Sequence, residues 1–130
     1  MEHNWERAEE RVKTLIKGWR TPGSGNQRIK GDVRNKTWVW EVKQTSQLVF
    51  TLYHTWLQEL EEIHLSEGKE VGFALFFNLH PFYFVLDEYQ SVEQPWKTLN
   101  IVEQKVPAEI VTSKGIWRRV TESELKENYL

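Results

Sequence analysis

The sequence predicts an α/β protein in which a mixed central β-sheet is flanked by helices. Apolar residues recur at helical spacing in two segments, strand-like segments lie between and after them, and one strand is apolar at nearly every position. This order of helix, strands, helix and strands is typical of a small α/β sandwich. The 130 residues have the length of one domain. We expect its core at about residues 4–87, with an extension at 88–130 to which the sequence assigns no role.

The first helix is predicted over residues 4–19. Its apolar stripe consists of Trp5, Ala8, Val12, Leu15, Ile16 and Trp19. Glu9 lies about 60° from Val12 around the helix, at the edge of this stripe. We therefore expect its carboxylate to point toward the protein body, where it needs a partner.

The next segments are a loop, two strands and a second helix. Residues 21–27 form the loop, because they hold a proline, two glycines and short polar side chains. Residues 31–34 and 37–43 are predicted strands joined by a turn at 35–36. A long helix is predicted over 47–64 and is ended by Gly68.

The remaining elements are mostly strands. The apolar run 71–77 is typical of a strand covered on both faces, and residues 82–86 form its hairpin partner. Weaker patterns favour a helical turn at 91–96 and short strands at 109–112 and 115–120. A capping box at 121–124 opens a short C-terminal helix.

Charge and composition limit the function. The net charge is −2, yet residues 11–43 hold nine basic and two acidic residues, so this segment carries +7 and the remainder −9. The basic segment favours a polyanionic partner, although a solvated charged face gives the same pattern. The absence of cysteine excludes disulfides, thiol nucleophiles and cysteine-bound metals. The polar N-terminus and the lack of a run of ~20 apolar residues favour a cytoplasmic protein.

Three residues suggest a chemistry. If the turn spans about four residues, Arg34 faces Val39 and Asp32 faces Glu41, with Cβ atoms ~5 Å apart. Strand alternation puts Lys43 on the same face as Glu41. Two carboxylates without histidine or cysteine suit Mg²⁺ or Mn²⁺, and such a site can hydrolyse phosphodiesters. The alternative is a solvent-facing strand on which acidic and basic residues simply alternate.

The surrounding sequence resembles a known superfamily. Residues 20–33 read RTPGSGNQRIKGDV and residues 38–45 read WVWEVKQT. Over residues 8–86 the chain resembles the PD-(D/E)XK nucleases, above all the Holliday junction resolvases of archaea and their phage-encoded relatives, although Gly31 stands in the place of the proline. The resemblance implies a restriction-endonuclease-like core in a protein of a bacterial, archaeal or phage-infected cell.

The resemblance also implies functional residues. Asp32, Glu41 and the backbone carbonyl of Val42 would hold Mg²⁺, with Mn²⁺ as a substitute. Lys43 would stand at the attacking water, and Glu9 would be the outer acid and a further candidate ligand. The candidate DNA-binding residues are Arg20, Ser24, Asn26, Gln27, Arg28, Lys30 and Thr45. Taken without the neighbouring acids, the Gly/Ser loop favours the interpretation as a flexible connection over a phosphate contact.

The implied function is that of a homodimeric endonuclease acting on four-way DNA junctions. The alternatives are a nuclease of the same fold acting on nicked, mismatched or restriction-type duplex, and a catalytically silent nucleic-acid-binding module. The sequence does not distinguish the two nuclease substrates.

Histidines and tryptophans are assigned mainly structural roles. We expect His3, His54, His64 and His80 at the surface, and Trp5, Trp19, Trp38, Trp40 and Trp56 in the core. Trp96 and Trp117, with Arg118 and Arg119 beside the latter, favour a subunit interface over base stacking.

Overall fold

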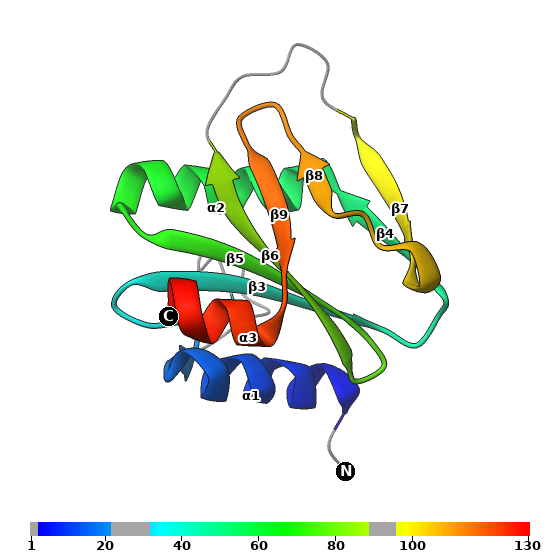
Figure 1. Ribbon diagram of the computed structural model, residues 1–130, viewed down its shortest axis with the longest axis horizontal. Helices are drawn as coiled ribbons and strands as arrows, with labels where there is room; N and C mark the ends of the chain where they lie inside the picture. Colours follow the sequence, from blue (N-terminus) through cyan, green and yellow to red (C-terminus); the bar gives the residue numbers. More distant parts are fainter. Residues whose placement is uncertain (1–2, 22–31, 89–95) are drawn as a thin grey trace.

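The computed structural model describes residues 3–21, 32–88 and 96–130. In these residues a seven-stranded sheet has the order β1-β2-β3-β5-β6-β9-β8, and a separate ribbon pairs β4 with β7 (Figure 1). β3 and β5 are parallel and the other paired strands are antiparallel, so the central sheet is mixed. The elements are α1 (Asn4–Ile16), β1 (Trp19–Arg20), β2 (Val33–Arg34), β3 (Trp38–Thr45), β4 (Val49–Tyr53), α2 (His54–Glu67), β5 (Glu70–Phe77), β6 (His80–Glu88), β7 (Thr98–Val102), η1 (Glu103–Lys105), β8 (Glu109–Val111), β9 (Ile116–Val120), α3 (Glu122–Glu124) and η2 (Leu125–Tyr129).

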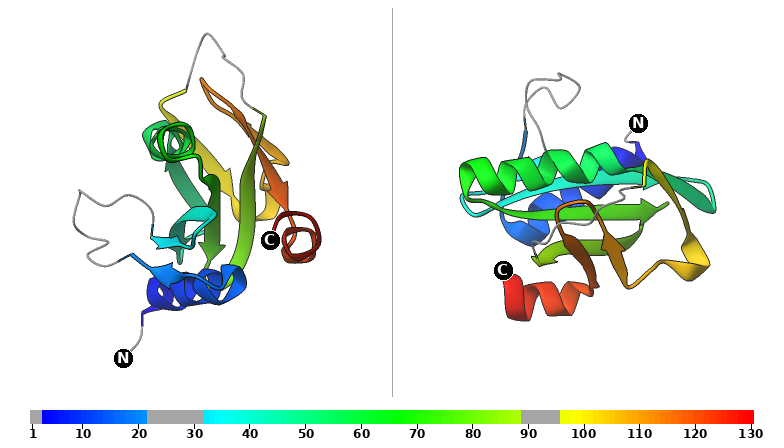
Figure 2. Two further views of the ribbon diagram at one scale, coloured as in Figure 1. Left: turned by 90° about the vertical axis from the view of Figure 1, so that its left-hand side faces the viewer. Right: turned by 90° about the horizontal axis from the view of Figure 1, so that it is seen from above.

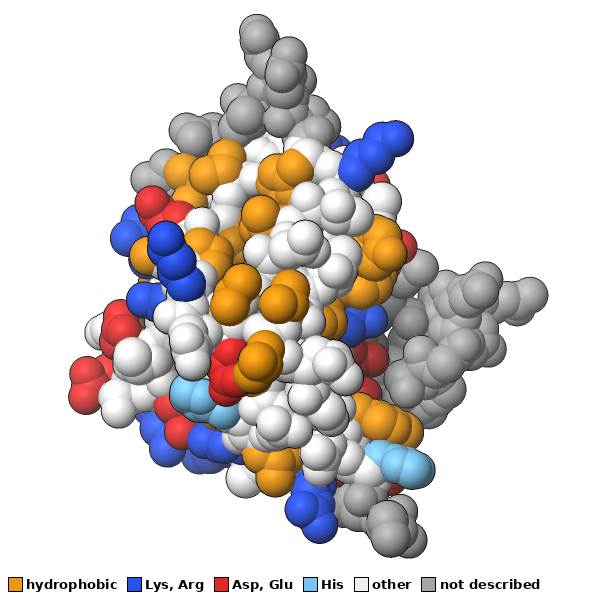
Figure 3. All heavy atoms as spheres, turned by 90° about the vertical axis from the view of Figure 1, so that its right-hand side faces the viewer, with side chains coloured by type: hydrophobic (Ala, Val, Ile, Leu, Met, Phe, Trp, Pro, Cys, Tyr) orange, Lys and Arg blue, Asp and Glu red, His pale blue; other side chains and the backbone are white. Residues whose placement is uncertain are grey.

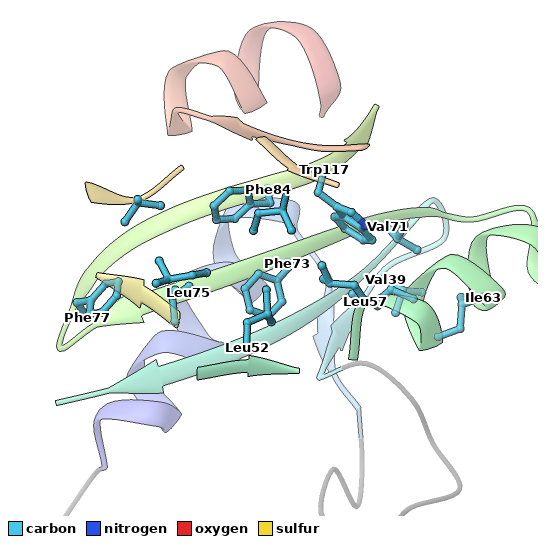
Figure 4. Close-up of a cluster of buried hydrophobic side chains, with 14 residues drawn as sticks. Val39, Leu52, Leu57, Ile63, Val71, Phe73, Leu75, Phe77, Phe84 and Trp117 are labelled. Carbon is cyan, nitrogen blue, oxygen red and sulfur yellow. The ribbon is translucent and has the colours of Figure 1, made fainter. Parts of the chain in front are cut away.

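The helices α1 and α2 cover opposite faces of the sheet (Figure 2). Side chains alternate along β3, so Trp40 packs with residues of α1 while Val39 packs with residues of α2. Figure 4 shows the cluster on the α2 side, where Phe73 and Phe84 meet Trp117. Because both faces of β5 are covered, residues 71–77 are buried, as the apolar run predicted.

The first helix is shorter than predicted. It ends at Ile16, because Lys17 adopts the left-handed conformation with φ 55° and closes the helix. Trp19 belongs instead to β1, which pairs with β2. Trp5 and Trp19 are 46% and 48% exposed, so their placement in the core was wrong.

The helix predicted over 47–64 begins later. Residues 49–53 form β4, which pairs with β7 from Val49 opposite Val102 to Tyr53 opposite Thr98. This pairing joins segments nearly fifty residues apart, so local periodicity could not reveal it. The outer face of the ribbon leaves Val49, Tyr53 and Val102 exposed, and Figure 3 shows apolar side chains on that side of the molecule. The predicted end is confirmed, because Gly68 caps α2 with φ 69°.

The C-terminal third is part of the same sheets. β8 and β9 complete the seven-stranded sheet, and Trp117 is fully buried beneath α2. Trp117 is therefore available neither for base stacking nor for a subunit interface, and the prediction was wrong at this residue. The strands near 109–112 and 115–120 and the capping box at Thr121 are confirmed. Of the helical turn predicted over 91–96, only Trp96 lies inside the described residues.

Two smaller observations complete the fold. His54 is buried and its Nε2 accepts a hydrogen bond from the Ser113 N–H, so the prediction of a surface histidine was wrong at this position. None of the helices in the described ranges is long and apolar enough to cross a membrane.

Candidate active site

A tight turn sets the register of β2 against β3. The Asn35 N–H donates to the Trp38 carbonyl, and the Asn35 side-chain oxygen accepts from the N–H groups of Thr37 and Trp38. Arg34 therefore pairs with Val39, as the sequence predicted. Continuing this register by two positions brings Asp32 opposite Glu41.

Asp32 lies where β2 stops and β3 continues. Its N–H donates to the Trp40 carbonyl at 2.9 Å, and its Oδ2 accepts the Val42 N–H at 2.8 Å. The Val42 N–H thus donates to the Asp32 carboxylate, whereas in a regular antiparallel ladder it would donate to a backbone carbonyl of the neighbouring strand. The carbonyl of Val42 leaves β3 on the same side as its N–H, toward Asp32.

Glu41 and Lys43 lie together on the α2 side of β3. The Lys43 Nζ is 3.4 Å from the Glu41 Oε1, and the two side chains are 29% and 17% exposed. The predicted grouping of Asp32, Glu41 and Lys43 on one face therefore agrees with the structure.

The electrostatics of this group are unfavourable for a second negative charge. Burial and then the charge of Asp32 raise the pKa of Glu41, Lys43 opposes the shift, and the net change is from about 4.5 to about 8. Neutralising both carboxylates requires positive charge beyond the one ammonium group that the described structure provides here.

Glu9 approaches Asp32 from α1. It is 6% exposed, and its Oε1 accepts from the Arg20 Nη2 at 2.8 Å and from the Nε at 3.0 Å. Burial and then the charge of Asp32 raise the pKa of Glu9, whereas Arg20 lowers it. The expected inward carboxylate is confirmed, and its partner is Arg20, which also lies 5.9 Å from the Trp5 ring centroid.

The remaining predicted DNA-binding residues fall in two groups. Thr45 ends β3, where its hydroxyl accepts the Gln47 N–H at 3.0 Å and its carbonyl accepts the Asn78 N–H at 2.7 Å. The others lie outside the described residues, and they are Ser24, Asn26, Gln27, Arg28 and Lys30.

The donor chemistry fits a hard divalent cation. Within residues 3–21, 32–88 and 96–130, no three acidic, histidine or cysteine side chains are grouped closely enough to hold a metal ion. Asp32 and Glu41 nevertheless form a mutually repelling pair of oxygen donors beside the Val42 carbonyl. Oxygen-only ligation of this kind is what Mg²⁺ prefers, often with water completing its shell.

Comparison with solved structures identifies a related fold. The 1.6 Å structure of Hjc, a Holliday junction resolvase from the archaeal hyperthermophile Archaeoglobus fulgidus, matches with a TM-score of 0.54 and 23% identity, covering 78% of this chain and 90% of that chain. The fold is similar to that of a resolvase. The predicted fold class, a mixed sheet flanked by helices in a nuclease-like arrangement, is thereby confirmed. No family model and no curated protein matches the sequence.

One neighbour of the site was not anticipated in this role. Trp56, expected only as a core residue, is half-buried and places its ring centroid 4.2 Å from the Lys43 Nζ. No local motif indicates this contact, because it depends on how α2 packs against β3.

Proposed function

We propose that the protein is a metal-dependent endonuclease that hydrolyses DNA phosphodiester bonds, with a four-way junction as its substrate. The observation that carries the proposal is the half-buried pair Asp32 and Glu41 meeting Lys43 where β2 ends and β3 continues. The similarity of the fold to a Holliday junction resolvase supports the choice of DNA and of the junction.

Asp32, Glu41 and the carbonyl of Val42 are the residues that would hold Mg²⁺ or Mn²⁺, with Glu9 as a further candidate. A divalent cation there supplies Lewis acidity at the phosphate and lowers the pKa of a bound water. Lys43 can donate hydrogen bonds that orient the attacking water and offset charge that develops on the phosphate.

Arg20 is suited to a phosphate contact while remaining paired. Its Nε and Nη2 are bound to Glu9, which fixes the plane of the guanidinium. An arginine has five N–H donors, so the remaining ones are free of that carboxylate and can bind a phosphate oxygen. In this proposal Glu9 positions Arg20 as well as adding negative charge near Asp32.

Junction resolution requires two symmetric cuts, and we therefore propose that a homodimer is the active form. The excess of basic residues between positions 11 and 43 supports a polyanionic partner near the site.

The test is cleavage of labelled four-way junction, linear duplex and single strand in parallel, with Mg²⁺ and with chelator. We expect paired cuts near the branch that require Mg²⁺ and are lost in Lys43→Ala. Lys13→Ala is the matched control, because Lys13 is an exposed lysine paired with Glu10 on α1.

Cleavage of duplex or single strand instead of the junction would support the proposed active site but overturn the four-way junction as its substrate. Absence of metal-dependent cleavage from a folded dimer would overturn the proposal in favour of a nucleic-acid-binding module.

A further inference from the structure

The ammonium group of Lys43 rests against an aromatic ring. Its Nζ lies 4.2 Å from the ring centroid of Trp56, in the first turn of α2, while its ion pair with Glu41 measures 3.4 Å. A cation at this distance is attracted to the electron-rich face of an indole. Lys43 is thus held from two sides by groups of different chemistry.

The ring of Trp56 is itself held in place. Tyr53 meets it edge-on with centroids 4.9 Å apart, and Phe50 lies 6.0 Å away at a tilt. Both neighbours belong to β4, whose pairing with β7 fixes their positions.

The start of α2 is also tied down by hydrogen bonds. The His54 N–H donates to the Lys97 carbonyl at 3.0 Å, and the His54 Nε2 accepts the Ser113 N–H at 3.2 Å. Farther along the helix, Glu61 accepts from the Trp117 Nε1 at 2.9 Å and from the Thr112 hydroxyl. Trp56 therefore lies in a part of α2 that is anchored to β9 and to the segment between β8 and β9.

The two partners of Lys43 differ in what else they do. Glu41 is a proposed metal ligand, and a carboxylate that shares its charge with a divalent cation attracts an ammonium group less strongly. Trp56 is not a proposed metal ligand, so its attraction for the ammonium group does not weaken in this way. Without the Trp56 ring, the Lys43 side chain would regain its rotamer freedom once Glu41 binds the metal ion.

We propose that Trp56 is a positioning residue that holds the Lys43 ammonium beside Glu41. Its effect on catalysis rests on the proposed function, whereas its effect on the orientation of Lys43 does not. Trp56→Leu removes the ring but keeps apolar bulk, and Trp56→Phe keeps an aromatic face. Trp96→Leu is the matched control, since Trp96 is another half-buried tryptophan on the same core cluster.

The first readout is the ring-current shift of the Lys43 ε-methylene protons in NMR spectra of the metal-free protein. We expect an upfield shift in the wild type and in Trp96→Leu, a reduced shift in Trp56→Phe, and none in Trp56→Leu. An unshifted Lys43 signal in the wild type, or an unchanged shift in folded Trp56→Leu, would overturn the proposal whether or not the protein cleaves DNA.

The second readout is cleavage at saturating metal. We expect kcat of Trp56→Leu to fall roughly three- to thirtyfold with KM little changed, and Trp56→Phe to recover most of the loss. An unchanged kcat in Trp56→Leu would refute the positioning role in an active enzyme. Absence of cleavage by the wild type would refute the proposed function, and the NMR result would then decide the positioning of Lys43.

Discussion

Two glutamates in this protein are removed from solvent in different ways. Glu61 on α2 is fully buried in the core, where its Oε2 accepts from the Trp117 Nε1 at 2.9 Å and from the Thr112 hydroxyl. Glu41 on β3 lies where β2 ends, next to Asp32 and 3.4 Å from the Lys43 Nζ. The carboxyl group of Glu61 accepts from neutral donors, whereas that of Glu41 lies beside a second carboxylate and an ammonium group.

The difference separates a carboxyl group that stabilises the fold from one that is available for chemistry. The contacts of Glu61 join α2 to β9 and to the segment between β8 and β9, and its second oxygen has no hydrogen-bond partner among the described residues. Burial and Asp32 make the charged form of Glu41 costly, and a divalent cation at the proposed site would offset that cost. The comparison predicts opposite outcomes for substitutions at the two positions.

Cleavage activity should show the largest contrast. Glu41→Gln is expected to lower Mg²⁺-dependent cleavage by at least about a hundredfold, because it weakens a proposed metal ligand. Glu61→Gln keeps the shape of a side chain that is not a proposed ligand and keeps an oxygen acceptor, so it should retain activity per folded molecule. Equal losses in both variants, measured at matched folded fractions, would contradict the distinction.

For the free energy of unfolding we expect the reverse, with the larger loss at Glu61 and the smaller at Glu41. Glu61→Ala leaves the Trp117 N–H without its acceptor and opens a cavity, so we expect a loss of about 2–4 kcal/mol in urea denaturation. Glu41→Ala removes a repelling charge and should cost less, or stabilise the metal-free protein near pH 8. If Glu61→Ala were as stable as the wild type, the hydrogen bonds of Glu61 with Trp117 and Thr112 would not stabilise the fold.

Stability should also depend on pH. The pKa of Glu41 is raised from about 4.5 to about 8, so between these values the folded state binds more protons than the unfolded state. The free energy of unfolding of the metal-free protein therefore falls as pH rises through this range, by at most about 1.4 kcal/mol per pH unit for one group. Burial and Asp32 also raise the pKa of Glu9, which adds to the fall.

Urea denaturation at several pH values checks this dependence, and Glu41→Gln should flatten most of it. Saturating Mg²⁺ should also reduce the fall, because the cation binds the ionised carboxylates. A stability that rises over this range would contradict the raised pKa of Glu41.

Substitution of the exposed Glu122 should have the smallest effect on the free energy of unfolding. Glu122 pairs with Arg11 at 3.5 Å, with side chains 37% and 43% exposed. We expect Glu122→Ala to change the free energy of unfolding by less than about 1 kcal/mol, since solvent screens such pairs. A larger change would show that the C-terminal helix is tied to α1 more tightly than this ion pair explains.

Much of the site and part of the fold could be predicted from sequence because the signals are local. A turn at Asn35 and strand alternation were enough to place Asp32 opposite Glu41 with Lys43 on the same face. The apolar run at 71–77 was enough to identify a doubly covered strand. Helical spacing was enough to turn Glu9 inward.

The rest depends on distant parts of the chain. Residues 49–53 have helix-compatible spacing but pair with β7, and Trp117 is buried only because β9 lies under α2. The same packing brings Trp56 against Lys43. The exposure of Trp19 follows from Lys17, which ends α1 before the apolar stripe is complete.

In the proposed function Asp32 and Glu41 hold a metal ion, whereas Glu61 stabilises the fold. Calorimetric titration of Mn²⁺ into the wild type, Asp32→Asn and Glu61→Gln tests it most directly. We expect saturable binding with the same stoichiometry in the wild type and Glu61→Gln, and its loss in Asp32→Asn. Unchanged binding in folded Asp32→Asn, or no binding by the wild type, would contradict the claim.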